Sequence, residues 1–334
     1  MSTYRSPEVL ARAITAGQRR ALAKAITLSE SSRADHRAQA LDILESLGPG
    51  DGKSLRLGIS GPPGVGKSTF IEAFGLHAIS LGHRVAVLAV DPSSAISGGS
   101  ILGDKTRMEA LSRDLHAFIR PSPAGRTLGG VARRTHEAML LCEAAGFDVV
   151  MIETVGVGQS ETMVADMTDV LILLLQPGGG DDLQGIKRGI VELAAIVVVN
   201  KADGALKIAA QQTALDYGVA RAAQGPQGET GMLPVQTCSA LTGEGLPEAW
   251  ASVEKYCRAL RDSGELASRR GQQQRKWLWS ETAEDLLDVL RRDPAVKAEL
   301  HEIERAVVTG KMLPMTASRR LLDVFLHRRQ GGKE

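Results

Sequence analysis

The chain has 334 residues and is nearly neutral, with 40 lysines and arginines against 39 aspartates and glutamates. This length allows one large domain with extensions, or two domains. The charge balance gives no electrostatic support for binding nucleic acid or an anionic membrane surface, so neither is an expected partner. Hydrophobic residues make up 43% of the chain and aromatic residues only 3%. Such an aliphatic composition suits a parallel sheet built from Val, Ile and Leu.

Neither the apolar runs nor the cysteines point to a membrane or secreted protein. The runs at 170–175 and 194–199 are much too short to span a bilayer, and the first residues lead into a charged helical pattern rather than a signal peptide. Cys142, Cys238 and Cys257 are widely separated and match no metal-ligand or disulfide spacing. We therefore expect a cytoplasmic protein.

Residues 1–50 are expected to form a helical arm. Ser6 is a cap residue before Pro7 at the first helical position, and apolar residues recur at helical spacing as far as Leu47. The run GPGDG at 48–52 then interrupts the pattern. We assign packing rather than chemistry to this arm.

A phosphate-binding loop is predicted at 61–69, where GPPGVGKST fits the pattern G, four free positions, G, K, then S or T. A strand-like run at 55–60 precedes it and a helical pattern at 69–81 follows, which is the order that the motif needs. Glycines let backbone N–H groups approach a phosphate, and the helix dipole adds positive potential there. The expected nucleotide-binding residues are Gly61, Pro62, Pro63, Gly64, Val65, Gly66, Lys67, Ser68 and Thr69.

Lys67 and Ser68 have distinct expected roles within this loop. Lys67 would bridge the β- and γ-phosphates, and the Ser68 hydroxyl would bind Mg²⁺, which prefers oxygen ligands. A glycine-rich turn without a nucleotide is the alternative, but the Lys–Ser pair in a strand–loop–helix context argues against it.

Two aspartates after the next predicted strand are candidate metal ligands. The apolar run 84–90 ends at Asp91, which would lie beyond the carboxyl end of a parallel strand, where such sheets bind ligands. An ordinary Asp-Pro turn is the alternative. The glycine-rich and then polar segment 98–108 contains Asp104, a second metal candidate.

A further motif begins where the apolar strand 147–153 ends at Glu153. Glu153 would orient magnesium through water, and the Gly156 N–H would contact the γ-phosphate and so detect its presence. Val157 stands where Ras-like enzymes place the glutamine that orients the attacking water. We therefore expect slow intrinsic hydrolysis, with Gln159 as a weak substitute for that glutamine.

The predicted strand 170–176 is followed by the glycine-dense segment 177–189, which contains Lys187. This segment is a candidate third mobile element at the same edge of the sheet, although a solvated loop before a helix fits equally well. The expected catalytic residues are Lys67, Glu153, Gly156 and Lys187, and the expected metal ligands are Ser68, Asp91, Asp104 and Glu153.

The run NKAD at 200–203 follows the predicted strand 196–199 and indicates guanine selection. The Asp203 carboxylate can accept hydrogen bonds from both N1–H and the exocyclic amine of guanine, a pairing that adenine cannot make. Lys201 would cover the ring and Asn200 would tie the loop together.

The segment VQTCSAL at 235–241 is expected to complete the base site. The N–H of Ala240 would be offered to guanine O6, with Ser239 and Leu241 beside it. Cys238 is then structural rather than reactive.

From Trp250 to the end the pattern is helical, and its apolar series would pack on the core or on a second subunit. The polar run 269–276 is interpreted as a solvated face or linker. We accordingly divide the chain into a helical arm (1–50), a P-loop GTPase domain (51–262) and a C-terminal helical extension (263–334).

Together these segments resemble the methylmalonyl-CoA mutase-associated GTPases, the MeaB/ArgK group of metallochaperone-like P-loop GTPases. The runs GGSILGDKTRM at 98–108 and ETVGVGQSE at 153–161 are the most specific, and the likeness covers nearly the whole chain. The tripeptide AGR at 124–126 departs from the family's small polar residues, which puts contacts of that loop in doubt but not the nucleotide site.

The resemblance implies an α/β fold: a mostly parallel-sheet P-loop GTPase domain with N-terminal and C-terminal helical extensions. It implies GTP/GDP and Mg²⁺ as cofactors. The function implied is a GTP-hydrolysing chaperone of an adenosylcobalamin-dependent methylmalonyl-CoA mutase or related acyl-CoA mutase, which gates cofactor delivery and protects or rescues the mutase. A homodimer through the C-terminal helices, and switches around Asp104, Gly156 and Lys187, are also implied.

Two other functions compete with this one. A kinase linked to basic amino-acid transport would have to bind adenine, which the NKAD run at 200–203 argues against. A metallochaperone GTPase of the urease or hydrogenase maturation kind should carry a Cys/His cluster, and the seven histidines and three cysteines form no such pattern.

Overall fold

The computed structural model describes residues 6–90, 108–122, 128–154, 160–178, 188–222 and 235–330. The chain divides into two compact units, residues 1–273 and 274–334, which are described separately below.

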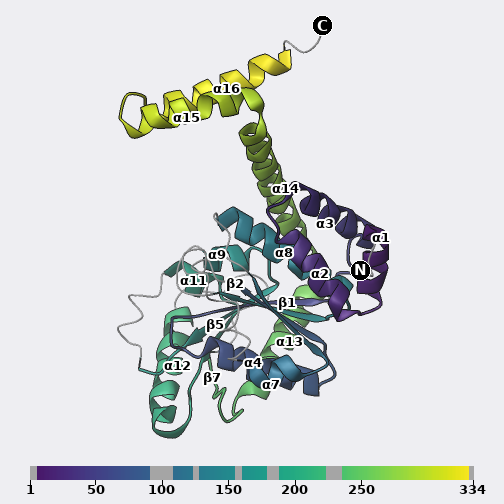
Figure 1. Cartoon of the computed structure of the whole chain (residues 1–334). Coiled ribbons are helices and arrows are strands. Elements are labelled where there is room, and N and C mark those ends of the chain that lie inside the picture. Colours follow the sequence, from purple (N-terminus) through teal and green to yellow (C-terminus); the bar gives the residue numbers. More distant parts are fainter. Residues whose placement is uncertain are drawn as a thin grey trace. The chain divides into compact units, whose positions relative to one another are not determined.

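A seven-stranded sheet in the order β3-β2-β4-β1-β5-β6-β7 forms the centre of the first unit (Figure 1). All the strand pairings among the described residues are parallel. The strands are β1 (Leu55–Ser60), β2 (Val85–Val90), β3 (Ala117–Ser122), β4 (Val149–Thr154), β5 (Val170–Leu175), β6 (Ile196–Val199) and β7 (Gln236–Thr237). The predicted α/β class with a mostly parallel sheet is confirmed.

Continuous apolar runs become central strands here because helices cover both faces of the sheet. Every residue of β4, β5 and β6 is buried. The helices of this part are α4 (Lys67–Ser80), α7 (Glu109–Arg113), α8 (Leu128–Ala144), α9 (Ser160–Ala165), α11 (Arg188–Leu193), α12 (Lys207–Ala222) and α13 (Leu246–Asp262), with a 3-10 turn at Gly204–Leu206.

The two faces of β1 show how the layers pack. Leu57 and Ile59 face a core that contains Phe74 of α4 and Trp250 of α13, whose rings meet edge to face with centroids 5.3 Å apart. Gly58 points to the opposite face, because side chains alternate along a strand. A Cβ there would lie 2.8 Å from Val164 Cγ1 of α9. The absence of a side chain at residue 58 therefore lets α9 pack directly on the sheet.

Three N-terminal helices, α1 (Pro7–Thr15), α2 (Arg19–Ser29) and α3 (Ala34–Leu47), also belong to the first unit. The Ser6 hydroxyl accepts a hydrogen bond from the Val9 N–H and Pro7 is the first helical residue, so the cap lies where the sequence predicts it. An ion pair between Glu30 and Arg120 fastens this arm to β3, with Arg120 Nε 3.1 Å from Glu30 Oε1.

The C-terminal helices are α14 (Glu265–Arg292), α15 (Pro294–Val308) and α16 (Pro314–Gln330). Asp293 caps α15 by accepting from the N–H groups of Ala295 (2.8 Å) and Val296 (3.2 Å). Within the second unit, the buried apolar residues are Val296, Ile303, Ala317 and Phe325. No helix in the described ranges is long and apolar enough to cross a membrane.

Our interpretation of 269–276 as a solvated face or linker is wrong for its first part. These residues lie inside α14, and the Gln273 side chain is buried. Arg269 and Arg270 donate hydrogen bonds to the chain around Asp169. These polar side chains bind buried carbonyl and carboxylate groups. A sequence pattern cannot show whether a polar side chain meets such groups or water.

Candidate nucleotide-binding site

The candidate site lies at the carboxyl edge of the sheet. Strands β4, β1, β5 and β6 are consecutive neighbours and all parallel, so their carboxyl ends meet at one edge. This arrangement brings together the phosphate loop after β1, Glu153 near the end of β4 and Asn200 after β6. Ligands of open parallel sheets bind at such an edge.

At two positions of the phosphate loop only glycine fits, because atoms of neighbouring segments approach the backbone closely. Gly66 has φ 90° at the start of α4, and a Cβ there would lie 2.9 Å from Asn200 Nδ2. A Cβ on Gly61 would lie 2.6 Å from the Leu174 carbonyl oxygen of β5. Larger residues at either position would displace backbone or base-loop atoms.

Lys67 is the cation of this loop. Its ammonium donates to the carbonyl oxygens of Gly61 (2.8 Å) and Pro62 (3.2 Å). Burial lowers the pKa of Lys67, and the negative charges of Glu153 and Glu161 act in the opposite direction. A partly buried ammonium whose hydrogen-bond acceptors are neutral carbonyls gains strongly from a phosphate group.

Ser68, the residue directly after Lys67, lies against Glu153. The Ser68 hydroxyl donates to Glu153 Oε1 (3.1 Å), and Glu153 is buried near the end of β4. A hydroxyl and a carboxylate are the oxygen donors that Mg²⁺ prefers, so this pair fits the ion.

Four of the predicted site residues, Asp91, Asp104, Gly156 and Lys187, lie outside the described residues. Across the described ranges, no group of three or more His, Cys, Asp or Glu side chains is placed to hold a metal ion. Ser68 and Glu153 are therefore the part of the predicted magnesium shell that the structure places.

Asn200 connects the base loops to the phosphate loop. Its buried side chain donates from Nδ2 to the Val65 carbonyl (2.9 Å) and accepts at Oδ1 from the Ala240 N–H (3.1 Å). The Ala240 N–H is thus engaged with Asn200, and its contact with guanine O6 stays a prediction. Lys201, with φ 60°, also reaches the phosphate loop, because its Nζ donates to the Gly64 carbonyl (2.6 Å).

Asp203 is held by Ser239. The Ser239 hydroxyl donates to Asp203 Oδ2 (2.5 Å) and accepts from the Thr242 N–H (3.1 Å). These contacts fix the carboxylate that we expect to read guanine. Leu241 is exposed beside this loop. Burial raises the pKa of Cys238 to about 12, which keeps the thiol protonated and agrees with a structural role.

Sequence reasoning quoted Glu161 within a motif but gave it no role. It is buried in the first turn of α9, and its charge acts on Lys67 together with that of Glu153. The available signal was only an acidic residue eight positions after Glu153 in the sequence. The contacts of Asn200 and Lys201 with the phosphate loop also have no local sequence signal, because they join residues more than a hundred positions apart.

Comparison with known proteins identifies the family. The family model described as "Methylmalonyl Co-A mutase-associated GTPase MeaB" matches residues 22–295. A "Putative GTPase" of Caulobacter vibrioides is 54% identical over 312 residues, which covers 93% of this chain and 95% of the relative. The "Methylmalonic aciduria type A homolog, mitochondrial" of Mus musculus is 46% identical over 322 residues, 93% of this chain and 78% of its own.

A solved structure agrees with these sequence matches. The crystal structure titled "LAO/AO transport system kinase" superposes with a TM-score of 0.72 at 38% identity, covering 95% of this chain and 96% of the other. The matched ranges include the phosphate loop, the strand that carries Glu153 and both base loops. The resemblance drawn from the sequence is confirmed, and this chain belongs to the MeaB family of methylmalonyl-CoA mutase-associated GTPases.

Proposed function

We propose that this protein acts in the cytoplasm as a GTP-hydrolysing chaperone of an adenosylcobalamin-dependent methylmalonyl-CoA mutase or a related acyl-CoA mutase. It would gate cofactor loading and protect or reactivate the mutase. The observation that carries the GTPase part is the buried Asn200 side chain, which joins the phosphate loop at Val65 to the base loop at Ala240. The family description and the name of the mouse relative support the mutase as partner.

The residues of the site have separate tasks in this reaction. Lys67 holds the β- and γ-phosphates, and Asp203, fixed by Ser239, selects guanine. Ser68 and Glu153, with Asp91 and Asp104, would hold Mg²⁺. When bound, this ion neutralises charge that develops on the phosphate oxygens.

The segments around Asp104, Gly156 and Lys187 are proposed to be the switches. The Gly156 N–H would contact the γ-phosphate. Loss of this phosphate on hydrolysis would release the segment around Gly156. Val157 in place of a water-orienting glutamine favours slow hydrolysis by the protein alone. Stimulation by a partner is then the natural means of control.

The first test compares GTP and ATP hydrolysis by the purified protein, with and without the methylmalonyl-CoA mutase of the same organism. We expect slow turnover of GTP alone that rises when the mutase is added. A Lys187→Ala variant should keep nearly unchanged GDP affinity but lose part of the stimulation. Hydrolysis of ATP would instead favour the kinase function. GTP hydrolysis that does not rise when the mutase is added would indicate a related acyl-CoA mutase as the partner.

We also propose a homodimer through the C-terminal extension, residues 263–334. The second unit leaves many large apolar side chains exposed, including Trp279 (66% exposed) and Leu286 (57% exposed) one heptad apart on α14. Exposed apolar side chains at this density are typical of a surface that another chain covers. The further exposed residues in the described part of this unit are Leu278, Leu287, Val289, Val308, Leu313, Met315, Leu322 and Leu326.

Replacement of Leu286 by glutamate should convert the dimer to a monomer, because an uncompensated charge would be buried in the interface. Sedimentation velocity at micromolar concentration measures this change. Leu115→Glu is the matched control, since Leu115 is 83% exposed and lies outside the extension. A wild-type protein that sediments as a monomer, or a Leu286→Glu variant that stays dimeric, would refute the proposed interface.

A further inference from the structure

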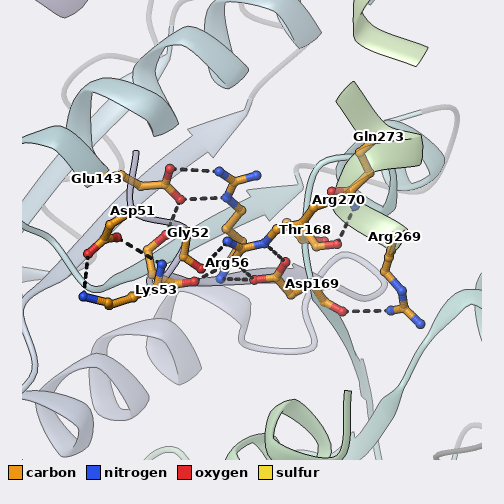
Figure 2. A network of polar contacts seen from close by, with 11 residues as sticks. Asp51, Gly52, Lys53, Arg56, Glu143, Thr168, Asp169, Arg269, Arg270 and Gln273 are labelled. Atoms are coloured by element: carbon orange, nitrogen blue, oxygen red, sulfur yellow. Dashed lines mark hydrogen bonds and ion pairs between the residues drawn. The ribbon is translucent and has the colours of Figure 1, made fainter. Parts of the chain in front are cut away.

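The first turns of α14 hold the chain segment that joins α9 to β5. Arg270 forms a bidentate pair with Asp169, from Nε to Oδ1 (2.8 Å) and from Nη2 to Oδ2 (2.7 Å), as Figure 2 shows. The exposed fractions of the two side chains are 12% for Arg270 and 1% for Asp169. Arg270 also donates to the carbonyl oxygens of Gly52 and Ser54, both at 2.6 Å.

Two further side chains of α14 complete the contact. Arg269 Nη1 donates to the Asp169 carbonyl (2.9 Å), and Gln273 Nε2 donates to the Thr168 carbonyl (2.9 Å). The Asp169 carboxylate accepts in addition from the Arg56 N–H of β1 (2.9 Å). We call the contacts of Arg269, Arg270 and Gln273 with Thr168 and Asp169 the α14 clamp.

The clamped residues Thr168 and Asp169 follow α9 directly in the chain. Thr168 Oγ1 donates to the Val164 carbonyl (2.8 Å), so the segment continues directly from the helix. A Cβ on Gly58 would lie 2.8 Å from Val164 Cγ1 and 3.0 Å from Thr168 Oγ1, so no space separates β1 from this end of α9. A shift of α9 must therefore move Thr168 and the carbonyl that Gln273 holds.

The first turn of α9 lies near the phosphate site. Glu161 is buried in its first turn and acts electrostatically on Lys67. The stretch 155–159, which contains Gly156, connects α9 to the strand that carries Glu153. The short helix α9 thus begins near the phosphate site and is followed directly by the segment that the α14 clamp holds.

From this geometry we infer that Asp169 and Gln273 are positioning residues for GTP hydrolysis, through which α14 sets the preference of the site for GTP over GDP. The inference rests on the proposed GTPase function. The γ-phosphate contact proposed above for Gly156 would favour one position of α9, and the α14 clamp stabilises one position of the segment that follows this helix. Because such coupling is reciprocal, weakening the α14 clamp must change the relative affinities of the two nucleotides.

The test uses two conservative variants of the full chain. Asp169→Asn keeps the shape of the side chain and removes its charge, and Gln273→Met removes one hydrogen bond at nearly constant length. Each variant is measured for affinity to GDP and to a non-hydrolysable GTP analogue, and for kcat with GTP. We expect the affinity ratio to change on the order of threefold to tenfold, with a matching change in kcat.

Glu30→Gln is the matched control, because Glu30 is also a buried carboxylate paired with an arginine but joins α2 to β3. It should lower the melting temperature and leave the affinity ratio unchanged. Variants that lose stability but keep the wild-type ratio and kcat would show that the α14 clamp is only structural. If the Asp169→Asn variant does not fold, the affinity ratio and kcat of the Gln273→Met variant decide the question. A wild-type protein without GTP binding would overturn the proposed function and this inference together.

Discussion

Replacing Lys67 by alanine is expected to lower the affinity for GTP and GDP by roughly 30-fold to a few thousandfold. The ammonium lies in the phosphate loop against the carbonyl oxygens of Gly61 and Pro62, where it would face the phosphates. Removing one partner of a buried, charge-assisted contact typically costs about 2–5 kcal/mol, which corresponds to this range of affinity. Titration calorimetry with GDP measures the loss directly.

The control for this prediction is Lys53→Ala, because Lys53 is exposed and pairs only with the exposed Asp51 among the described residues. It should bind GDP as the wild type does. The melting temperature of each variant without nucleotide separates lost binding from lost folding. If Lys67→Ala is folded and binds GDP with wild-type affinity, the loop at 61–69 does not hold phosphates.

The sheet and its helices were largely predictable because their signals are local. Continuous apolar runs gave the central strands, and GPPGVGKST needed only its own spacing and the neighbouring elements. The expected helix at 69–81 begins instead at Lys67, because the loop's last residues already form the first turn of α4. Local propensity does not fix such boundaries.

Contacts between distant segments were not predictable from the sequence. Arg270 meets Asp169 across about a hundred residues, and the polar run around it gave the same pattern as a solvated helix. The continuous helical pattern after Trp250 also conceals breaks, such as the one between α14 and α15 where Asp293 and Pro294 start a new helix. Only three-dimensional packing distinguishes a polar side chain that meets water from one that meets a buried carbonyl.

The base loop combines a local signal, which the sequence shows, with contacts to distant segments, which it does not show. The run NKAD was recognisable because guanine recognition needs a carboxylate at a strand end, yet the support of Asp203 by Ser239 depends on a segment more than thirty residues later. Asn200 likewise binds two separate loops. The chemical identity of the base reader was therefore predictable, whereas the groups that hold it in place became visible only in the fold.

The Asp203→Asn substitution is expected to change the base preference of the site from guanine to xanthine. An asparagine can still accept from the Ser239 hydroxyl, which now bonds Asp203 Oδ2 at 2.5 Å, so the loop should keep its shape. Its amide, however, would oppose the N–H donors of guanine and instead suit the C2 carbonyl of xanthine. A site built to hydrogen-bond a polar group discriminates strongly against the wrong partner, so GDP affinity should fall by at least about a hundredfold.

Calorimetric titrations of the Asp203→Asn variant with GDP, xanthosine diphosphate and ADP test this exchange. We expect xanthosine diphosphate to bind the variant more tightly than GDP does, with no gain for ADP. Asp216→Asn is the control, since Asp216 is an exposed residue of α12 that contacts Gln212 and not the base loop. Unchanged GDP affinity in Asp203→Asn would remove Asp203 from the base site. Tight ADP binding by the wild type would instead make adenine the natural base, and with it the kinase the better description of this chain.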